Sequence, residues 1–150
     1  MIVDNCSLEI GQTKRGYELL SCEEHYWLIK KRKKTPEDYR PDLVHQTLMA
    51  LLDSPLNKNH KLQIFLRTIK GHTIEVSPEI RIPRTFKRFS GLFAQLMTKG
   101  RINASSTGGK TLLEVNNYPI HTLVHPNCRY YKLNHETRGN LVDSLPQYVE

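Results

Sequence analysis

The sequence predicts one domain of the α/β or α+β class, in which helices and strands interleave. Apolar residues recur at helical spacing after Pro41 and again between Phe86 and Met97. Between Leu62 and Leu66 they alternate with polar residues, as in a half-buried strand. A length of 150 residues suits a single domain with its own core.

The first forty residues predict little regular structure. A very short strand is expected at residues 1–3, a loop at 4–7 and a partly helical segment within 17–30. Residues 30–34 are five consecutive basic residues. Their mutual repulsion favours a loop or a mobile tip.

A helix is expected to begin at Pro41, because the fixed φ of proline suits the first helical position. Asp42 would lie in its first turn, where an anion complements the helix dipole. The sequence Asp53-Ser54-Pro55 is expected to end this helix. Four strands are expected beyond it, the first two paired as a hairpin: 62–66, 73–76, 111–115 and 130–133.

Residues 81–91 (Arg-Ile-Pro-Arg-Thr-Phe-Lys-Arg-Phe-Ser-Gly) are the most informative segment. If a helix begins near Pro83, Arg84 and Arg88 share a face, and the apolar residues up to the terminating Gly100 share the opposite one. One side would then pack in a core, and the other would present guanidinium groups that suit phosphate oxygens. An ordinary amphipathic surface helix has the same pattern, so this segment alone leaves both interpretations open.

The charge of the chain favours an acidic partner. A net charge of +7 and a pI near 9.4 indicate nucleic acid first and an anionic membrane surface second. No apolar run approaches the roughly 20 residues of a membrane span, and the first residues lack the pattern of a secretory signal. Cys6, Cys22 and Cys128 are odd in number and far apart, which favours reduced thiols in a cytosolic or nuclear setting.

Two motifs suggest ligand sites that we do not expect. Residues 104–111 resemble a phosphate-binding loop, but a helix is expected before them and a strand after them, the reverse of that motif. A flexible Ser/Gly turn fits better. A histidine and cysteine group is too loosely spaced for a usual zinc site, so no metal is expected. This group comprises His121, His125, Cys128 and His135.

Arg40-Pro41-Asp42 places an arginine and an acid at the expected entrance of a helix. The acid can pair with the arginine and orient its guanidinium group. The same pattern also suits helix capping with an exposed salt bridge of little energetic weight. The sequence leaves both interpretations open.

Four segments together resemble one family. They are Tyr-Glu-Leu-Leu at 17–20 followed by Cys22 and His25, Arg-Pro-Asp-Leu-Val-His-Gln at 40–46, Leu-Leu-Asp-Ser-Pro-Leu-Asn-Lys at 51–58, and the basic motif at 81–92. In this order they are similar to the eukaryotic branch of the ribosome-biogenesis methyltransferases that methylate N1 of a pseudouridine in small-subunit rRNA. The resemblance covers nearly the whole chain.

The resemblance implies a SPOUT-like α/β knot fold across residues 1–150, a homodimer, S-adenosylmethionine as cofactor, and work with the small-subunit assembly machinery in the nucleolus. It assigns rRNA binding to Arg40, Arg81, Arg84 and Arg88. Asp42 matches an acid that supports the neighbouring arginine and loop. Asp42 is also the candidate catalytic proton acceptor for N1 of pseudouridine, although a carboxylate paired with Arg40 should be a poor base.

The chain departs from the family pattern at its C-terminal end. The family continues into a glycine-containing loop and a Ser-Asn-Tyr-Pro-Leu-Ser-like segment, which form the knot and hold the cofactor, and neither occurs here. The knot is therefore expected to be incomplete, and no cofactor-binding residue is expected in this chain. The leading hypothesis is the rRNA-recognition portion of the methyltransferase. The alternatives are a non-catalytic RNA-binding assembly factor and a generic basic nucleic-acid-binding domain.

Overall fold

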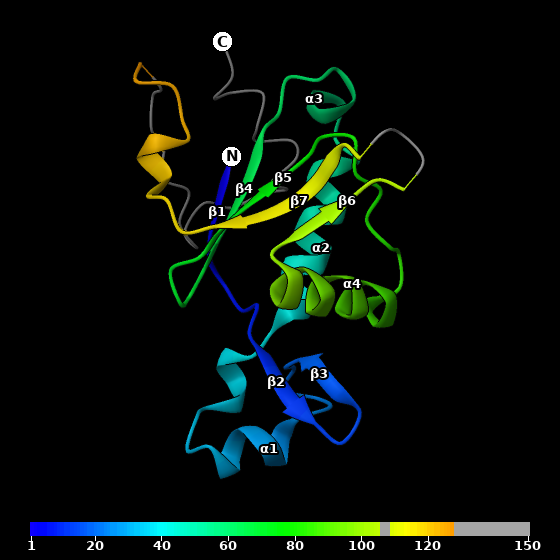
Figure 1. The fold of residues 1–150 in the computed structure, drawn as a ribbon, viewed down its shortest axis with the longest axis vertical. Coiled ribbons are helices and arrows are strands. Elements are labelled where there is room, and N and C mark those ends of the chain that lie inside the picture. Colours follow the sequence, from blue (N-terminus) through cyan, green and yellow to red (C-terminus); the bar gives the residue numbers. More distant parts are fainter. Residues whose placement is uncertain (106–108, 128–150) are drawn as a thin grey trace.

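A five-stranded sheet forms the main body of the computed structural model, which describes residues 1–105 and 109–127 (Figure 1). Its strand order is β1-β4-β5-β7-β6. β1 and β4 are parallel, and the other neighbouring pairs are antiparallel. The strands are β1 (Ile2–Cys6), β4 (Ile64–Thr68), β5 (Thr73–Val76), β6 (Arg101–Asn103) and β7 (Thr111–Asn116).

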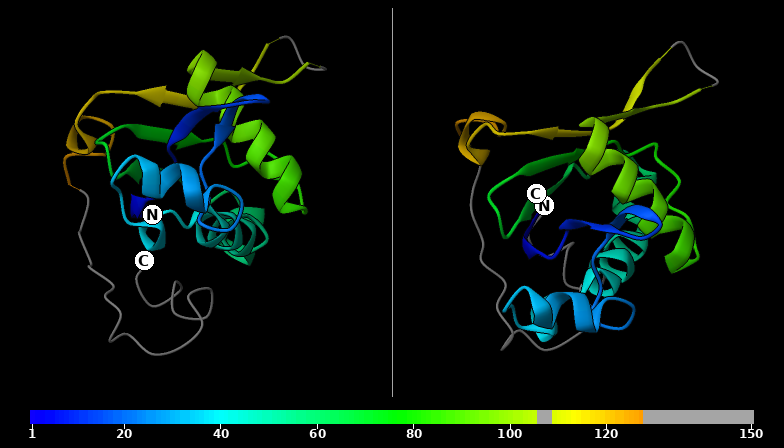
Figure 2. Two further views of the ribbon diagram at one scale, coloured as in Figure 1. Left: turned by 90° about the horizontal axis from the view of Figure 1, so that it is seen from below. Right: turned by 60° about the horizontal axis from the view of Figure 1, so that its bottom comes forward.

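Two helices, α2 (Pro41–Leu52) and α4 (Phe86–Lys99), lie against one face of this sheet (Figures 1 and 2). Ile64 lies opposite Val76 and Leu66 opposite Ile74, so all four side chains point to this face. The two helices contribute apolar stripes that meet it. The fully enclosed side chains of this core include Leu48, Leu51, Leu66, Ile74, Val76, Phe89, Phe93, Leu96 and Leu113.

A small lobe lies at the end of the molecule away from the sheet (Figure 1). It contains the antiparallel hairpin of β2 (Ile10–Thr13) and β3 (Gly16–Leu19), the helix α1 (Tyr26–Lys31) and the 3-10 turn η1 (Pro36–Asp38). Leu20, Ile29 and Tyr39 form its own buried cluster. The lobe therefore has a hydrophobic centre separate from the main core.

Several predicted elements are confirmed. α2 begins at Pro41, and β4 and β5 form the expected hairpin, with β4 displaced toward Thr68. β7 coincides with the strand expected at 111–115. Gly100 ends α4 with a φ of 80°, in the left-handed region that glycine adopts without steric cost.

Other predictions were wrong in detail because they depended on distant contacts. The expected loop at 4–7 belongs largely to β1, which pairs with β4 across some 60 positions of sequence. The partly helical segment expected within 17–30 is confirmed by α1, but β3, which was not predicted, precedes it. The basic run 30–34 begins inside α1 and leaves the helix only at Arg32. Pro55 does not merely end α2, because it opens the short helix α3 (Pro55–Lys58).

The start of α4 was also predicted incorrectly. It begins at Phe86, not near Pro83, and Thr85 occupies the N-cap position. Ile80 and Ile82 are both buried, whereas Arg81 between them is exposed. This alternation requires an extended backbone, so the helix cannot start before the isoleucines have reached the core. Arg84 consequently precedes the helix and does not share a helical face with Arg88.

Some predictions concern residues outside the described ranges: Cys128, His135 and the strand at 130–133. The Ser/Gly segment at 104–111 connects β6 to β7 and is described at its two ends. There the backbone N–H of Ala104 donates to the carbonyl oxygen of Lys110. The segment leads from strand to strand, which differs from the strand-to-helix context of a phosphate-binding loop. Of the helices in the described ranges, none is both long and apolar enough to cross a membrane.

Candidate nucleic-acid interface

Arg40 and Asp42 form a local ion pair at the N-terminus of α2. Arg40 is the N-cap residue, and its Nε and Nη2 donate to the two oxygens of Asp42 at 3.0 and 2.8 Å. This two-point contact fixes the plane of the guanidinium group. The Arg40 guanidinium also lowers the pKa of Asp42 below its ordinary value. Asp42 is therefore ionised at neutral pH and orients Arg40, which was one of the two interpretations that the sequence left open.

Arg84 and Asp53 form a second ion pair at the opposite end of α2. Nη1 and Nη2 of Arg84 donate to the Asp53 carboxylate at 2.6 and 2.8 Å. Asp53 is the C-cap residue of α2, where the helix dipole disfavours an anion. The guanidinium compensates that charge and lowers the pKa of Asp53. Because α2 has 12 residues, the two pairs lie about 18 Å apart along the helix.

The remaining basic residues of the motif have no such compensation. Arg81 is exposed on the extended segment, and Lys87 and Arg88 are exposed in the first turn of α4. That turn contains no acid. No salt bridge within 1–105 and 109–127 involves any of these three residues. Two cations at the positive end of a helix disfavour folding, so this surface is well suited to an external anion.

His45 holds this basic segment in place, and sequence reasoning did not single it out. The side chain is buried in α2, and its Nε2 lies 2.7 Å from the carbonyl oxygen of Pro83. The ring stacks on Phe89 of α4, with 4.5 Å between centroids. The signal in the sequence is a polar residue beside Val44, three positions before Leu48, on the apolar face of α2. His45 therefore joins α2, the extended segment and α4.

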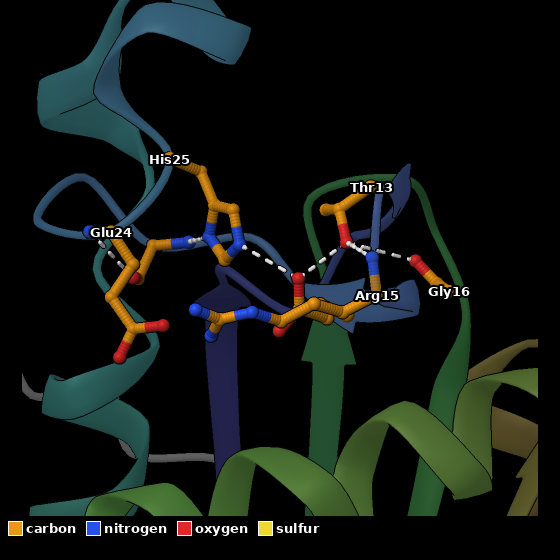
Figure 3. A network of polar contacts seen from close by, with 7 residues as sticks. Thr13, Arg15, Gly16, Glu24 and His25 are labelled. Atoms are coloured by element: carbon orange, nitrogen blue, oxygen red, sulfur yellow. Dashed lines mark hydrogen bonds and ion pairs between the residues drawn. The ribbon is translucent and has the colours of Figure 1, made fainter.

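A network in the small lobe fixes the start of α1 (Figure 3). The backbone N–H of Ser21 donates to Nδ1 of His25, the N-cap residue, at 3.2 Å, so the ring presents Nε2–H to Glu18 at 3.5 Å. Glu18 also accepts a hydrogen bond from the Thr13 hydroxyl, which together with His25 lowers the pKa of Glu18.

Glu18, Glu24 and His25 lie close enough to share a cation. However, His25 is already held through both ring nitrogens and Glu24 is exposed, so this geometry anchors a helix and does not indicate a metal centre. His121 and His125 of the earlier metal candidates are exposed, with no further cysteine or acid gathered around them in the described ranges.

We assign no residue of the described ranges to the methyl donor that the resemblance implies. A hollow of about 910 Å³ between the sheet and the small lobe has a suitable size. One acid of its lining, Glu9, is already engaged: it accepts hydrogen bonds from Lys34 at 3.2 Å and Tyr39 at 3.0 Å, and it forms a 3.2 Å ion pair with Lys70. A second hollow of about 220 Å³ has an acidic lining. We therefore derive no step that passes through a bound cofactor.

Comparison with known proteins places this chain in a family. The EMG1/NEP1 methyltransferase profile matches residues 1–147. The chain belongs to the EMG1/NEP1 methyltransferase family. The resemblance inferred from the sequence is therefore confirmed.

Relatives from distant eukaryotes agree with this assignment. The chain is 47% identical over 117 residues to ribosomal RNA small subunit methyltransferase nep-1 of Caenorhabditis elegans, an alignment that covers 78% of this chain and 51% of that protein. It is 42% identical over 120 residues to ribosomal RNA small subunit methyltransferase NEP1 of Homo sapiens, an alignment that covers 80% of this chain and 49% of that protein. The chain thus spans about half the length of these relatives.

A solved structure supports the fold of the EMG1/NEP1 family. Archaeoglobus fulgidus Nep1, determined with bound S-adenosylhomocysteine, matches with a TM-score of 0.58 at 27% identity. The match covers 83% of this chain and 63% of that one. The expected SPOUT-like α/β class is confirmed by this likeness. The assignments of Arg40, Asp42, Arg81, Arg84 and Arg88 to individual roles remain predictions.

Proposed function

We propose that this chain is the rRNA-recognition part of a small-subunit rRNA methyltransferase that acts on N1 of a pseudouridine. Its relatives are named as small-subunit rRNA methyltransferases, and its structural neighbour holds S-adenosylhomocysteine, the product left when S-adenosylmethionine gives up its methyl group. The observation that carries the proposal is the exposed and uncompensated charge of Arg81, Lys87 and Arg88.

The basic residues would hold the phosphate backbone of the RNA on either side of a target loop. Arg81, Lys87 and Arg88 present donors at the N-terminus of α4, where the helix dipole adds to their charge. Arg40 stands at the other end of α2 with its guanidinium plane already fixed. Such contacts position an RNA without reading its sequence. The base itself would be recognised in a single-stranded or extruded form.

Arg40 would also contribute to the chemistry of the base. N1 of pseudouridine carries a proton that must leave before or during methylation, and a fixed guanidinium group stabilises the anion that develops. Asp42 supports this role by holding Arg40. Its lowered pKa argues against its accepting the proton itself. The cofactor would supply an electrophilic methyl group in this reaction.

The proposal includes a setting for the protein. Members of the family that the sequence resembles act as homodimers in the nucleolus, with the machinery that assembles the small ribosomal subunit. We extend the same partners and location to the protein to which this chain belongs. A net charge of +7 suits a partner as acidic as rRNA.

Calorimetry with S-adenosylmethionine and with a small-subunit rRNA hairpin tests the proposal. We expect the 150-residue chain to bind the hairpin with strong salt dependence. Lys87→Ala should weaken binding and reduce the salt slope by about 1. Lys99→Ala, at the other end of α4, is the matched control and should leave both unchanged. A hairpin that does not bind, or binds with the same slope to the Lys87 variant, would contradict the proposal.

A second candidate function is a non-catalytic RNA-binding assembly factor. It requires only the exposed basic residues Arg81, Lys87 and Arg88, which the proposed function also uses. If this chain binds RNA but not the cofactor, the result agrees with both the rRNA-recognition part of a methyltransferase and a non-catalytic assembly factor. Binding of both ligands would exclude the non-catalytic alternative.

A further inference from the structure

The small lobe presents a face of α1 whose residues are unusual for a protein surface. Tyr26 and Trp27 occupy its first turn, and Lys30 and Lys31 follow four positions later on the same side. Trp27 is 81% exposed, the highest value among the large hydrophobic side chains of the described ranges. Ile29 points the other way and is buried. We call these four exposed residues the α1 face.

We infer that the α1 face is a second RNA-contacting surface, which binds single-stranded RNA by stacking bases on Trp27 and pairing phosphates with Lys30 and Lys31. The inference rests on the proposed function, because it extends the same RNA beyond the arginines. Every base has a π-face, so an exposed indole beside cations recognises single strands with little sequence preference.

The geometry of the two aromatic rings suits stacking. The Tyr26 and Trp27 rings meet edge to face, with centroids 5.3 Å apart and planes at 89°. Lys30 Nζ lies 5.7 Å from the Tyr26 ring, a cation–π distance. Tyr26 thus contacts both the indole and the Lys30 ammonium group, while most of Trp27 is exposed to solvent.

The charge around the α1 face favours a polyanion. Residues 26–34 contain five basic residues and no acid. Of these, Lys34 is paired with Glu9, and no salt bridge within the described ranges involves Lys30 or Lys31. Glu23 and Glu24 precede the helix, so the phosphates are expected at the lysine end and the base at the aromatic end.

The helix that carries the α1 face is anchored at its start and along its buried side, which lowers the cost of ordering it on binding. His25 and Glu18 anchor the start of the helix (Figure 3). Ile29 packs with Leu20 and Tyr39 beneath it. α1 lies at the end of the molecule remote from the sheet (Figure 1). η1 follows α1 in the chain and ends two residues before Arg40. Cys22, shortly before α1, donates its backbone N–H to the carbonyl oxygen of Tyr39, the neighbour of Arg40, so an RNA held at Arg40 would meet the start of the lobe.

A membrane is the less suitable occupant of this surface. Aromatic and basic residues on one helix also occur in interfacial membrane helices, but those bury a broad apolar face. α1 has six residues, and its aliphatic side chains Leu28 and Ile29 pack into the lobe instead. Only Tyr26 and Trp27 would be left to insert into a bilayer, which is too little apolar surface for an interfacial helix.

Trp27 is the only tryptophan of the chain, so its fluorescence reports on this site directly. We expect a short oligouridylate to quench it. Binding of the same oligonucleotide, followed independently by the anisotropy of a fluorescent label, should weaken about 5- to 150-fold in Trp27→Ala. The double change Lys30→Ala with Lys31→Ala should flatten the salt slope by roughly 1.4. Tyr118→Ala removes another exposed aromatic side chain and should bind as the unaltered chain does.

The outcomes separate this inference from the proposed function. If RNA binds, and Lys87→Ala weakens it, but Trp27 is not quenched and Trp27→Ala binds normally, the α1 face is overturned and the proposed function stands. If no RNA binds in the anisotropy assay, both fail. If vesicles containing phosphatidylserine shift the Trp27 emission and the oligonucleotide does not, the inference is overturned in favour of a membrane surface. Unfolding curves of the variants should match, because the altered side chains are exposed.

Discussion

Arg84 and Asp53 bind each other through two hydrogen bonds of 2.6 and 2.8 Å, although 31 positions of sequence separate them. The pair joins the C-terminus of α2 to the segment before α4. Both side chains remain more than half exposed. The contact therefore orients a guanidinium group at the surface and adds little to the stability of the fold.

Asp53→Asn should free Arg84 for an RNA phosphate. We expect the thermal midpoint to change little, because the pair is exposed, and the affinity for an rRNA hairpin to stay equal or rise, because one negative charge leaves the surface. Titrations by fluorescence anisotropy at several salt concentrations measure this. Arg84→Ala is the complementary variant and should weaken binding. A clear loss of affinity in Asp53→Asn would show that Arg84 must stay paired to work.

Asp42→Asn separates an orienting role from a proton-accepting one. The variant keeps the size of the side chain but removes the charge that fixes Arg40. We expect weaker RNA binding, because Arg40 is proposed to face the reacting base and needs a fixed plane, which a phosphate contact by Arg84 does not. In a longer relative that turns over, mutated at the matching aspartate, the pH dependence of the rate should keep its shape, because a carboxylate of lowered pKa is ionised across the neutral range. Loss of an ionisation from that pH profile would instead assign the proton transfer to this carboxylate.

His45→Phe tests how the basic segment is positioned. Phenylalanine preserves stacking on Phe89 but cannot donate to the Pro83 carbonyl. Leaving that acceptor without its partner should cost about 1–3 kcal/mol of unfolding free energy. RNA affinity should fall although no charge near the RNA has changed, and the salt slope should stay as it was. Chemical denaturation measures the unfolding free energy, and RNA titration at several salt concentrations measures the affinity and the salt slope. A stable variant with unaltered affinity would remove His45 from this role.

Cys6 should resist alkylation in the folded protein. Its side chain is buried, and desolvation raises the pKa of the thiol to about 12. The thiol also donates to the Val3 carbonyl at 3.2 Å. Iodoacetamide at mildly alkaline pH should therefore modify Cys22, which is partly exposed, and leave Cys6 intact until denaturant is added. Peptide mapping by mass spectrometry distinguishes the two sites.

The same thiol makes the free energy of unfolding fall at alkaline pH. In the unfolded chain it ionises near pH 8.5, whereas in the fold its pKa is about 12. As pH rises, the unfolded state therefore loses its proton first. The stability of the fold that depends on the protonated Cys6 thiol is complete below pH 8.5 and is lost as pH rises toward 12. The slope is at most about 1.4 kcal/mol per pH unit. Cys6→Ala should lose less stability than the unaltered chain over this interval, and equal losses would exclude the effect.

The sequence by itself determined those elements whose causes lie within a few consecutive residues. Pro41 set the start of α2, Gly100 ended α4, and alternation identified the β4–β5 hairpin. Asp42 is two positions from Arg40, so their pair could be predicted as well. The arginines that suit phosphate were identified by their chemistry and by the family motif, both of which are visible in the chain itself.

Only the tertiary structure decided what depends on distant partners. β1 became a full strand because β4 lies beside it, and α4 began at Phe86 because Ile80, Ile82 and Pro83 are engaged by the core and by His45. Periodicity describes how a segment can fold, whereas the energy that selects its ends comes from side chains far along the sequence. For the same reason the sequence could not show that Arg84 pairs with Asp53, while Arg88 in the first turn of α4 has no ion pair within the described ranges.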